Sequence, residues 1–173
     1  MKKKPARGTR KANNPVSEET PSPPAEAARE LSLPFPIVGI GASAGGLEAL
    51  ELFLANVPAD SGMAFVIVQH LDPTHKGIMP ELLQRATGMK VVQVKDRTTV
   101  RPDCVYVIPP NKDMSILHGV LHLLEPAAPR GLRLPIDFFL RSLAQDRQEH
   151  SIGVILSGMG SDGTLDLRAI KEN

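Results

Sequence analysis

The chain contains a single cysteine, Cys104, so it cannot form a disulfide within itself. It also lacks a long hydrophobic run, because its apolar stretches fall well short of the roughly 18 residues that a membrane-spanning helix needs. The sequence begins Met1-Lys-Lys-Lys, as the basic region of a signal peptide does, but no apolar segment or cleavage site follows. These absences argue against secretion and membrane insertion, and they predict a soluble cytoplasmic protein.

Large apolar side chains are almost absent before Leu31, in a proline-rich segment that cannot bury enough surface to offset its ordering entropy. We therefore expect a disordered tail over residues 1–34 and a folded domain over residues 35–173. The tail holds seven Lys and Arg against four Glu, so the net charge of +1 combines a basic tail with a mildly acidic domain. The basic residues are diluted by acids and prolines and form no compact patch, so nucleic-acid binding is not expected.

From residue 36 onward, short apolar runs alternate with amphipathic segments, as an α/β protein requires. This pattern predicts a doubly wound, mainly parallel sheet with flanking helices. Ser115–Leu124 predicts a small antiparallel hairpin that turns at His118-Gly119. The last predicted helix runs close to Asn173, where such a sheet would continue with another strand, so we expect the domain to be C-terminally truncated. The expected strands cover 37–40, 64–68, 91–94, 105–108 and 152–156, and the expected helices cover 47–57, 78–86, 135–146 and a segment from Thr164.

Three groups capable of catalysis follow three of the predicted strands: Ser43, His70 and Asp162. In an open parallel sheet the strands end at one edge, where ligands bind. Residues far apart in the sequence are thus brought to one place. A serine, an imidazole and a carboxylate together are typical of nucleophilic catalysis, which recurs on unrelated folds in different chain orders.

Gly41-Ala-Ser-Ala-Gly45 fits the pattern G-x-S-x-G between a strand and a helix. Its glycines would let the chain turn sharply and expose the Ser43 hydroxyl, while the helix N-terminus would direct N–H groups at a developing oxyanion. Residues 39–44 also fit the dinucleotide fingerprint G-x-G-x-x-G/A. That interpretation expects an acidic residue at the tip of the next strand, where this chain has His70.

The remaining polar residues allow simpler interpretations. Asp162 could cap the helix beginning at Thr164, which is compatible with a catalytic role. The segment 70–75 holds two histidines and an aspartate, but Pro73 and its irregular spacing define no coordination geometry. His118 and His122 lie on the hairpin rather than on one helix face, so we interpret them as surface residues. We expect no metal and no cofactor.

Four motifs follow one another along the chain: Gly39-Ile-Gly-Ala-Ser-Ala-Gly-Gly46, Val68-Gln-His-Leu71, Tyr106-Val-Ile-Pro-Pro110 and Leu156-Ser-Gly-Met-Gly-Ser-Asp-Gly163. In this order they resemble the chemotaxis protein-glutamate methylesterases, whose catalytic domain is of the CheB type. The resemblance covers the chain from about Phe35 to Asn173. It implies hydrolysis of γ-glutamyl methyl esters on cytoplasmic helices of chemoreceptors, which releases methanol, and often deamidation of receptor glutamines.

The resemblance implies a role for each matching residue. Ser43 is the nucleophile, His70 is the general base and then the acid, and Asp162 orients His70. The backbone at Met159 and Ala44 supports the oxyanion. The family commonly has threonine where this chain has Ala44, and the missing hydroxyl is expected to lower activity.

The resemblance also suggests a context for the domain. No receiver domain is expected before residue 35, because the tail is too short and too polar to form one. Residues 70–76 resemble methylesterase domains at the start of hybrid proteins that continue with a methyltransferase domain and sensor kinase modules. The alternative to an active esterase is a catalytically weak or inactive regulatory module of such a protein.

Overall fold

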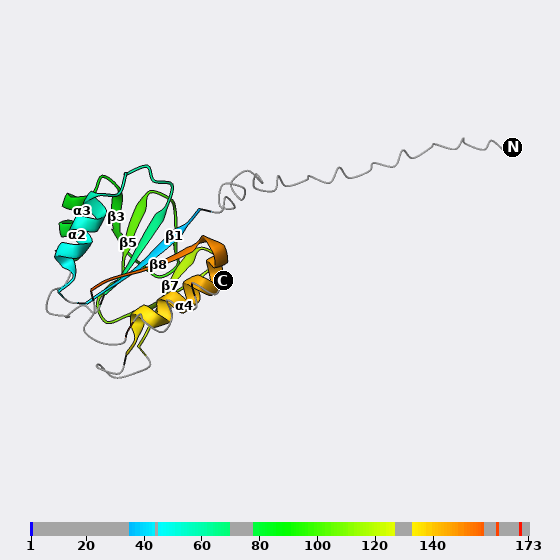
Figure 1. The fold of residues 1–173 in the computed structure, drawn as a ribbon. Coiled ribbons are helices and arrows are strands. Elements are labelled where there is room, and N and C mark those ends of the chain that lie inside the picture. The colour runs from blue at the N-terminus through cyan, green and yellow to red at the C-terminus, as the bar shows by residue number, and fades with distance from the viewer. Residues whose placement is uncertain are drawn as a thin grey trace. The chain divides into compact units, whose positions relative to one another are not determined.

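The fold is described from a computed structural model, which describes residues 1, 35–43, 45–69, 78–126, 133–157, 162 and 170. The chain divides into two units, Met1–Leu33 and Pro34–Asn173, and all described residues except Met1 belong to the second (Figure 1). The predicted disordered tail lies outside the described residues, Met1 apart. The predicted helix from Thr164 also lies outside them, except for Ile170, which is helical.

A five-stranded parallel sheet forms the centre of the domain, in the order β3-β5-β2-β1-β8. Each strand lies close to its predicted position, which confirms the mainly parallel sheet. Strand β1 lies beside the middle strand β2 and pairs with β2 on one side and β8 on the other, with Ala42 aligned to Gln69 and to Ser157. These three strands therefore end side by side. The strands are β1 (Ile37–Ala42), β2 (Ala64–Gln69), β3 (Lys90–Gln93), β5 (Cys104–Val107) and β8 (Ser151–Ser157).

Helices cover both faces of the sheet, as the doubly wound prediction requires (Figure 1). The first face packs against α2 (Leu47–Ala55) and α3 (Ile78–Ala86), and the second against α4 (Pro135–Arg147). Alternate residues of β1 pack on opposite faces of the sheet. Val38 belongs to the core under α2, and Ile37 belongs to the core under α4. None of the described helices is long and apolar enough to cross a membrane.

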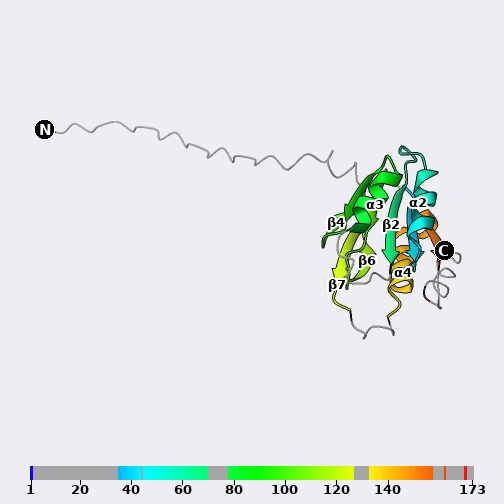
Figure 2. The ribbon, with the colours of Figure 1, turned by 90° about the vertical axis from the view of Figure 1, so that its left-hand side faces the viewer.

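A small antiparallel sheet, in the order β4-β7-β6, adds to the face that α4 covers (Figure 2). Its strands are β4 (Thr98–Thr99), β6 (Asp113–Leu117) and β7 (Val120–Leu124). The predicted hairpin is confirmed: His118 and Gly119 turn it with φ of 51° and 71°, as a type I′ turn requires. His118 is exposed and His122 half-buried. The Asp146 carboxylate on α4 accepts hydrogen bonds from the backbone N–H groups of both turn residues.

Two glycines of β1 let α4 approach the strand closely. A Cβ at Gly41 would lie 2.5 Å from Ile136 Cγ2 and 2.6 Å from Ile155 Cδ1, and one at Gly39 would lie 2.8 Å from Leu140 Cδ2. The sequence interpretation that Gly41 helps the chain to turn is therefore wrong. Gly41 lies inside the strand, where it makes room for a helix, and Gly45 has no positive φ. Gly39 and Gly41 are also the first two glycines of the dinucleotide pattern, so close packing against α4 explains why both positions hold glycine.

Tyr106 makes stability depend on pH in the alkaline range. Its hydroxyl accepts a hydrogen bond from the Arg101 N–H at 2.9 Å and donates to the Thr99 carbonyl at 3.4 Å. Burial raises the pKa of Tyr106 to about 12, against about 10 in an unfolded chain. Between these values the unfolded chain loses a proton that the folded protein keeps, so the stability from neutral Tyr106 is present below pH ~10 and is lost as pH rises toward ~12.

We therefore expect the difference in unfolding free energy between the wild type and Tyr106→Phe to shrink as pH rises through this window. Urea denaturation of both proteins at several alkaline pH values measures the difference. Other groups that titrate in this pH range contribute equally to the unfolding free energy of both proteins, so their contributions cancel in the difference. A difference that stays constant with pH would contradict the assignment.

Candidate active site

Ser43 and Asp162 follow neighbouring strands of the central sheet. Ser43 directly follows β1, and Asp162 lies in the chain segment after β8, which pairs with β1. Both residues are half-buried. The strand on the other side of β1 is β2, and the next residue in the sequence after its last residue, Gln69, is His70. The three strands that precede the predicted residues therefore end side by side at one edge of the sheet.

The chain turns from β1 into α2 at Ser43. The Ser43 carbonyl oxygen accepts the N–H of Gly46 at 2.9 Å, which closes a four-residue turn. Gly46 is the N-cap of α2, and its carbonyl accepts the N–H of Leu50 at 3.0 Å. Ser43 is therefore the first residue of a strand-turn-helix connection, close to the partial positive charge of a helix N-terminus. This is the context in which the G-x-S-x-G pattern has meaning.

Gln69 ties this turn to the neighbouring strand. Its Nε2 donates to the Ser43 carbonyl oxygen at 2.7 Å. The side chain is buried, and its Oε1 has no hydrogen-bond partner within the described residues. Sequence reasoning included Gln69 in a motif but gave it no role. The available signal was a polar residue at the end of the apolar run Ala64–Val68.

The Asp162 carboxylate binds the first turn of α4. Its Oδ1 accepts the N–H of Asp137 at 3.0 Å, and its Oδ2 accepts the N–H of Ile136 at 3.3 Å. The N-cap of α4, Leu134, makes no side-chain capping bond, and Pro135 follows it. Asp162 therefore satisfies two unpaired donors of this helix from a distant part of the chain, where its charge is favourable. The predicted cap of a helix at Thr164 falls outside the described residues.

The other predicted site residues, His70, Ala44 and Met159, also lie outside the described residues. So does the segment 70–75, which holds the histidines considered as metal ligands. Within the ranges that the structure describes, no group of three His, Cys, Asp or Glu side chains could hold a metal ion.

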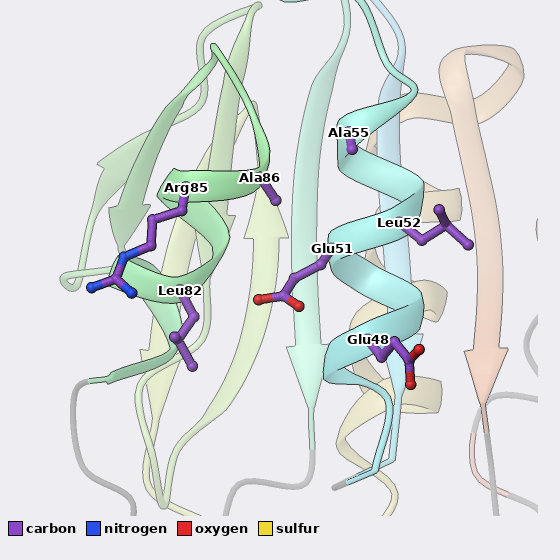
Figure 3. Close-up of a pocket in the computed structure, with 7 residues that line it drawn as sticks. All are labelled: Glu48, Glu51, Leu52, Ala55, Leu82, Arg85 and Ala86. Carbon is purple, nitrogen blue, oxygen red and sulfur yellow. The ribbon is translucent and has the colours of Figure 1, made fainter.

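A shallow groove of about 430 Å³ separates α2 from α3 (Figure 3). Glu51 points from α2 toward α3, and Leu82 faces the same space from α3. Neither Ser43 nor Asp162, the predicted catalytic residues that the structure describes, lines this groove. Its lining residues are Glu48, Glu51, Leu52, Ala55, Leu82, Arg85 and Ala86.

Comparison with known protein families assigns the chain to one of them. The sequence profile of the family described as CheB methylesterase matches residues 38–173. The chain belongs to the CheB methylesterase family. This confirms the resemblance seen in the four motifs, and the matched range begins within β1 and includes every later strand that the structure describes.

Relatives and a solved structure agree with this assignment. The chain is 34% identical over 152 residues to protein-glutamate methylesterase/protein-glutamine glutaminase 3 of Pseudomonas savastanoi pv. phaseolicola, and the match covers 87% of this chain and 44% of the relative. It is 35% identical over 144 residues to protein-glutamate methylesterase/protein-glutamine glutaminase 1 of Syntrophomonas wolfei, and that match covers 79% of this chain and 41% of the relative. The chain thus spans less than half the length of these relatives.

The crystal structure of the Thermotoga maritima CheB methylesterase catalytic domain superposes with a TM-score of 0.71 at 28% identity. The match covers 81% of this chain and 76% of that one. The predicted fold class is confirmed.

Proposed function

We propose that this CheB-type domain is a serine-type protein-glutamate methylesterase that hydrolyses γ-glutamyl methyl esters on chemoreceptors and also deamidates receptor glutamines. One observation carries the proposal. Ser43 leaves strand β1 at a strand-turn-helix connection, and β1 lies between the strand that precedes His70 and the strand that precedes Asp162. The names of the relatives supply the substrate class.

In the proposed mechanism, Ser43 Oγ attacks the carbonyl carbon of the ester while His70 accepts the hydroxyl proton. The N–H of Met159 and the backbone at Ala44 stabilise the tetrahedral oxyanion. Its collapse breaks the C–O bond, and His70 gives its proton to the departing methanol. Water, activated by His70, then attacks the glutamyl ester on Ser43; the bond from the acyl carbon to Ser43 Oγ breaks, His70 returns a proton to Ser43, and the receptor keeps a glutamate side chain with a free carboxylate. With a glutamine substrate the leaving group is ammonia.

The proposal extends to partners and location. The substrates are methylated helices in the cytoplasmic part of chemoreceptors, so the domain works in the cytoplasm. A methyltransferase domain or protein restores the esters that it removes, and sensor kinase modules belong to the same signalling system. Sequence resemblance to hybrid proteins supports these partners.

Two measurements test the proposal. The protein should release methanol from a chemoreceptor cytoplasmic fragment that carries isotopically labelled glutamyl methyl esters. It should also react at Ser43 with an alkyl fluorophosphonate, which labels activated serines whatever the natural substrate. Folded protein that gives neither result would instead favour the inactive regulatory module, for which the alanine at position 44 is the supporting feature.

We expect graded losses from the other two triad positions. His70→Ala removes the base and should reduce methanol release more than Asp162→Asn, which leaves the base in place but poorly aligned. Asp162→Asn should also lower stability by about 0.5–2 kcal/mol, because an amide presents only one oxygen to the two N–H groups of α4. Turnover rates and urea denaturation measure the two effects. Greater activity loss in Asp162→Asn than in His70→Ala would count against these roles.

A further inference from the structure

The Ser43 carbonyl oxygen accepts two hydrogen bonds of different origin. The N–H of Gly46, at 2.9 Å, belongs to the same turn. The Nε2 of Gln69, at 2.7 Å, comes from the end of β2. The first bond moves with the turn, whereas the second fixes the carbonyl relative to the sheet. Gln69 is only 4% exposed, so surrounding atoms hold its side chain in this position.

Fixing this carbonyl also fixes the other end of its peptide group. A peptide bond is planar and trans, so the N–H of the following residue points opposite to the carbonyl. The group that Gln69 holds therefore joins Ser43, the proposed nucleophile, to the N–H of residue 44. Rotation of this plane would move both the serine and the N–H donor that follows it.

Packing does not account for an amide at the end of β2. The Gln69 Oε1 is buried and has no hydrogen-bond partner among the residues that the structure describes. A buried acceptor without a partner costs free energy, and an apolar side chain of similar size would avoid that cost. The donor Nε2 is the part of the side chain that makes a contact with the proposed site.

We propose that Gln69 is a positioning residue that orients the Ser43–Ala44 peptide group, and through it the nucleophile and the N–H offered to the oxyanion. This inference rests on the proposed function, because it requires Ser43 to be acylated. Gln69 itself touches neither the ester nor the reacting atoms.

The test replaces Gln69 by leucine, which is close in size and cannot donate a hydrogen bond. We expect kcat for methanol release to fall about 10- to 100-fold, less than or comparable to the loss of an oxyanion donor, with KM nearly unchanged. Fluorophosphonate labelling of Ser43 should slow in parallel. The urea midpoint should stay the same or rise, because the buried Oε1 is removed.

Gln84→Leu is the matched control. Gln84 also donates to a backbone carbonyl, that of Met89 at 2.9 Å, but it lies on α3 away from Ser43. This variant should lose stability and keep wild-type kcat. If Gln69→Leu does not fold, Gln69→Met supplies the same comparison with a more adaptable side chain.

The outcomes separate the inference from the proposed function. Wild-type kcat in a folded Gln69 variant, with the wild type active, overturns the role of Gln69 alone. Stability loss without a change in kcat would show a structural role and also overturn it. Absence of both methanol release and Ser43 labelling in the wild type overturns the proposed function, and the role of Gln69 with it.

Discussion

Ser43→Ala is expected to reduce methanol release by about 10⁴-fold or more, the loss typical when a covalent nucleophile is removed. The remaining groups can still polarise the ester, but no oxygen is placed to attack it. The fold should be unaffected, because the main-chain carbonyl of residue 43, which makes the bonds to Gly46 and Gln69, is retained.

Methanol release from the labelled receptor fragment measures the effect, and circular dichroism checks the fold. Ser115→Ala is a suitable control, because Ser115 is half-buried on β6, in the antiparallel sheet. It should keep wild-type turnover. An alanine variant at position 43 that works as fast as the wild type would remove the basis of the mechanism.

Gly41→Ala is expected to destabilise the domain by about 1–3 kcal/mol, the usual cost of overpacking a core. The new methyl would lie 2.5 Å from Ile136 Cγ2, which is attached close to the α4 backbone and cannot swing away freely. Moving Ile136 moves the first turn of α4, whose N–H groups hold Asp162. Activity should therefore fall together with stability.

The second glycine of the G-x-S-x-G pattern supplies the control. Among the residues that the structure describes, no atom lies within 4 Å of a Cβ built at Gly45. Gly45→Ala should be neutral or slightly stabilising, because alanine lowers the entropy of the unfolded chain. Thermal unfolding of both variants shows whether the glycines of this pattern are needed for close packing against α4 or for turn formation. A larger loss at Gly45 than at Gly41 would favour the turn interpretation.

Local patterns in the sequence were sufficient to predict most of the fold. The apolar run Ala64–Val68 predicts β2 because a strand buried on both faces must be apolar throughout. Gly119 predicts the hairpin turn because a type I′ turn requires positive φ. Strand β4 was not predicted, because a strand of two residues is too short to show a periodic pattern of apolar residues.

Contacts between distant segments could not be predicted in the same way. Nothing near Asp162 in the sequence indicates that it binds the N–H groups of Ile136 and Asp137, because that pairing depends on how α4 packs against β1. The role of Gly41 depends on the same packing. The contact of Gln69 could not be predicted because its partner is the main-chain carbonyl of Ser43, which follows another strand. Every residue has such a carbonyl, so the sequence does not indicate which one is bound.

Helix α4 has a carboxylate contact near each end. Asp162 binds its first turn, and Asp146, near its last turn, binds the hairpin turn at His118-Gly119. At 1.5 Å per residue, its 13 residues span about 20 Å. The helix thus connects the edge of the sheet at which we propose the active site with the antiparallel sheet. A substitution in the hairpin that displaces α4 along its axis would misalign Asp162, so activity can be lost through a residue that lies far from the ester.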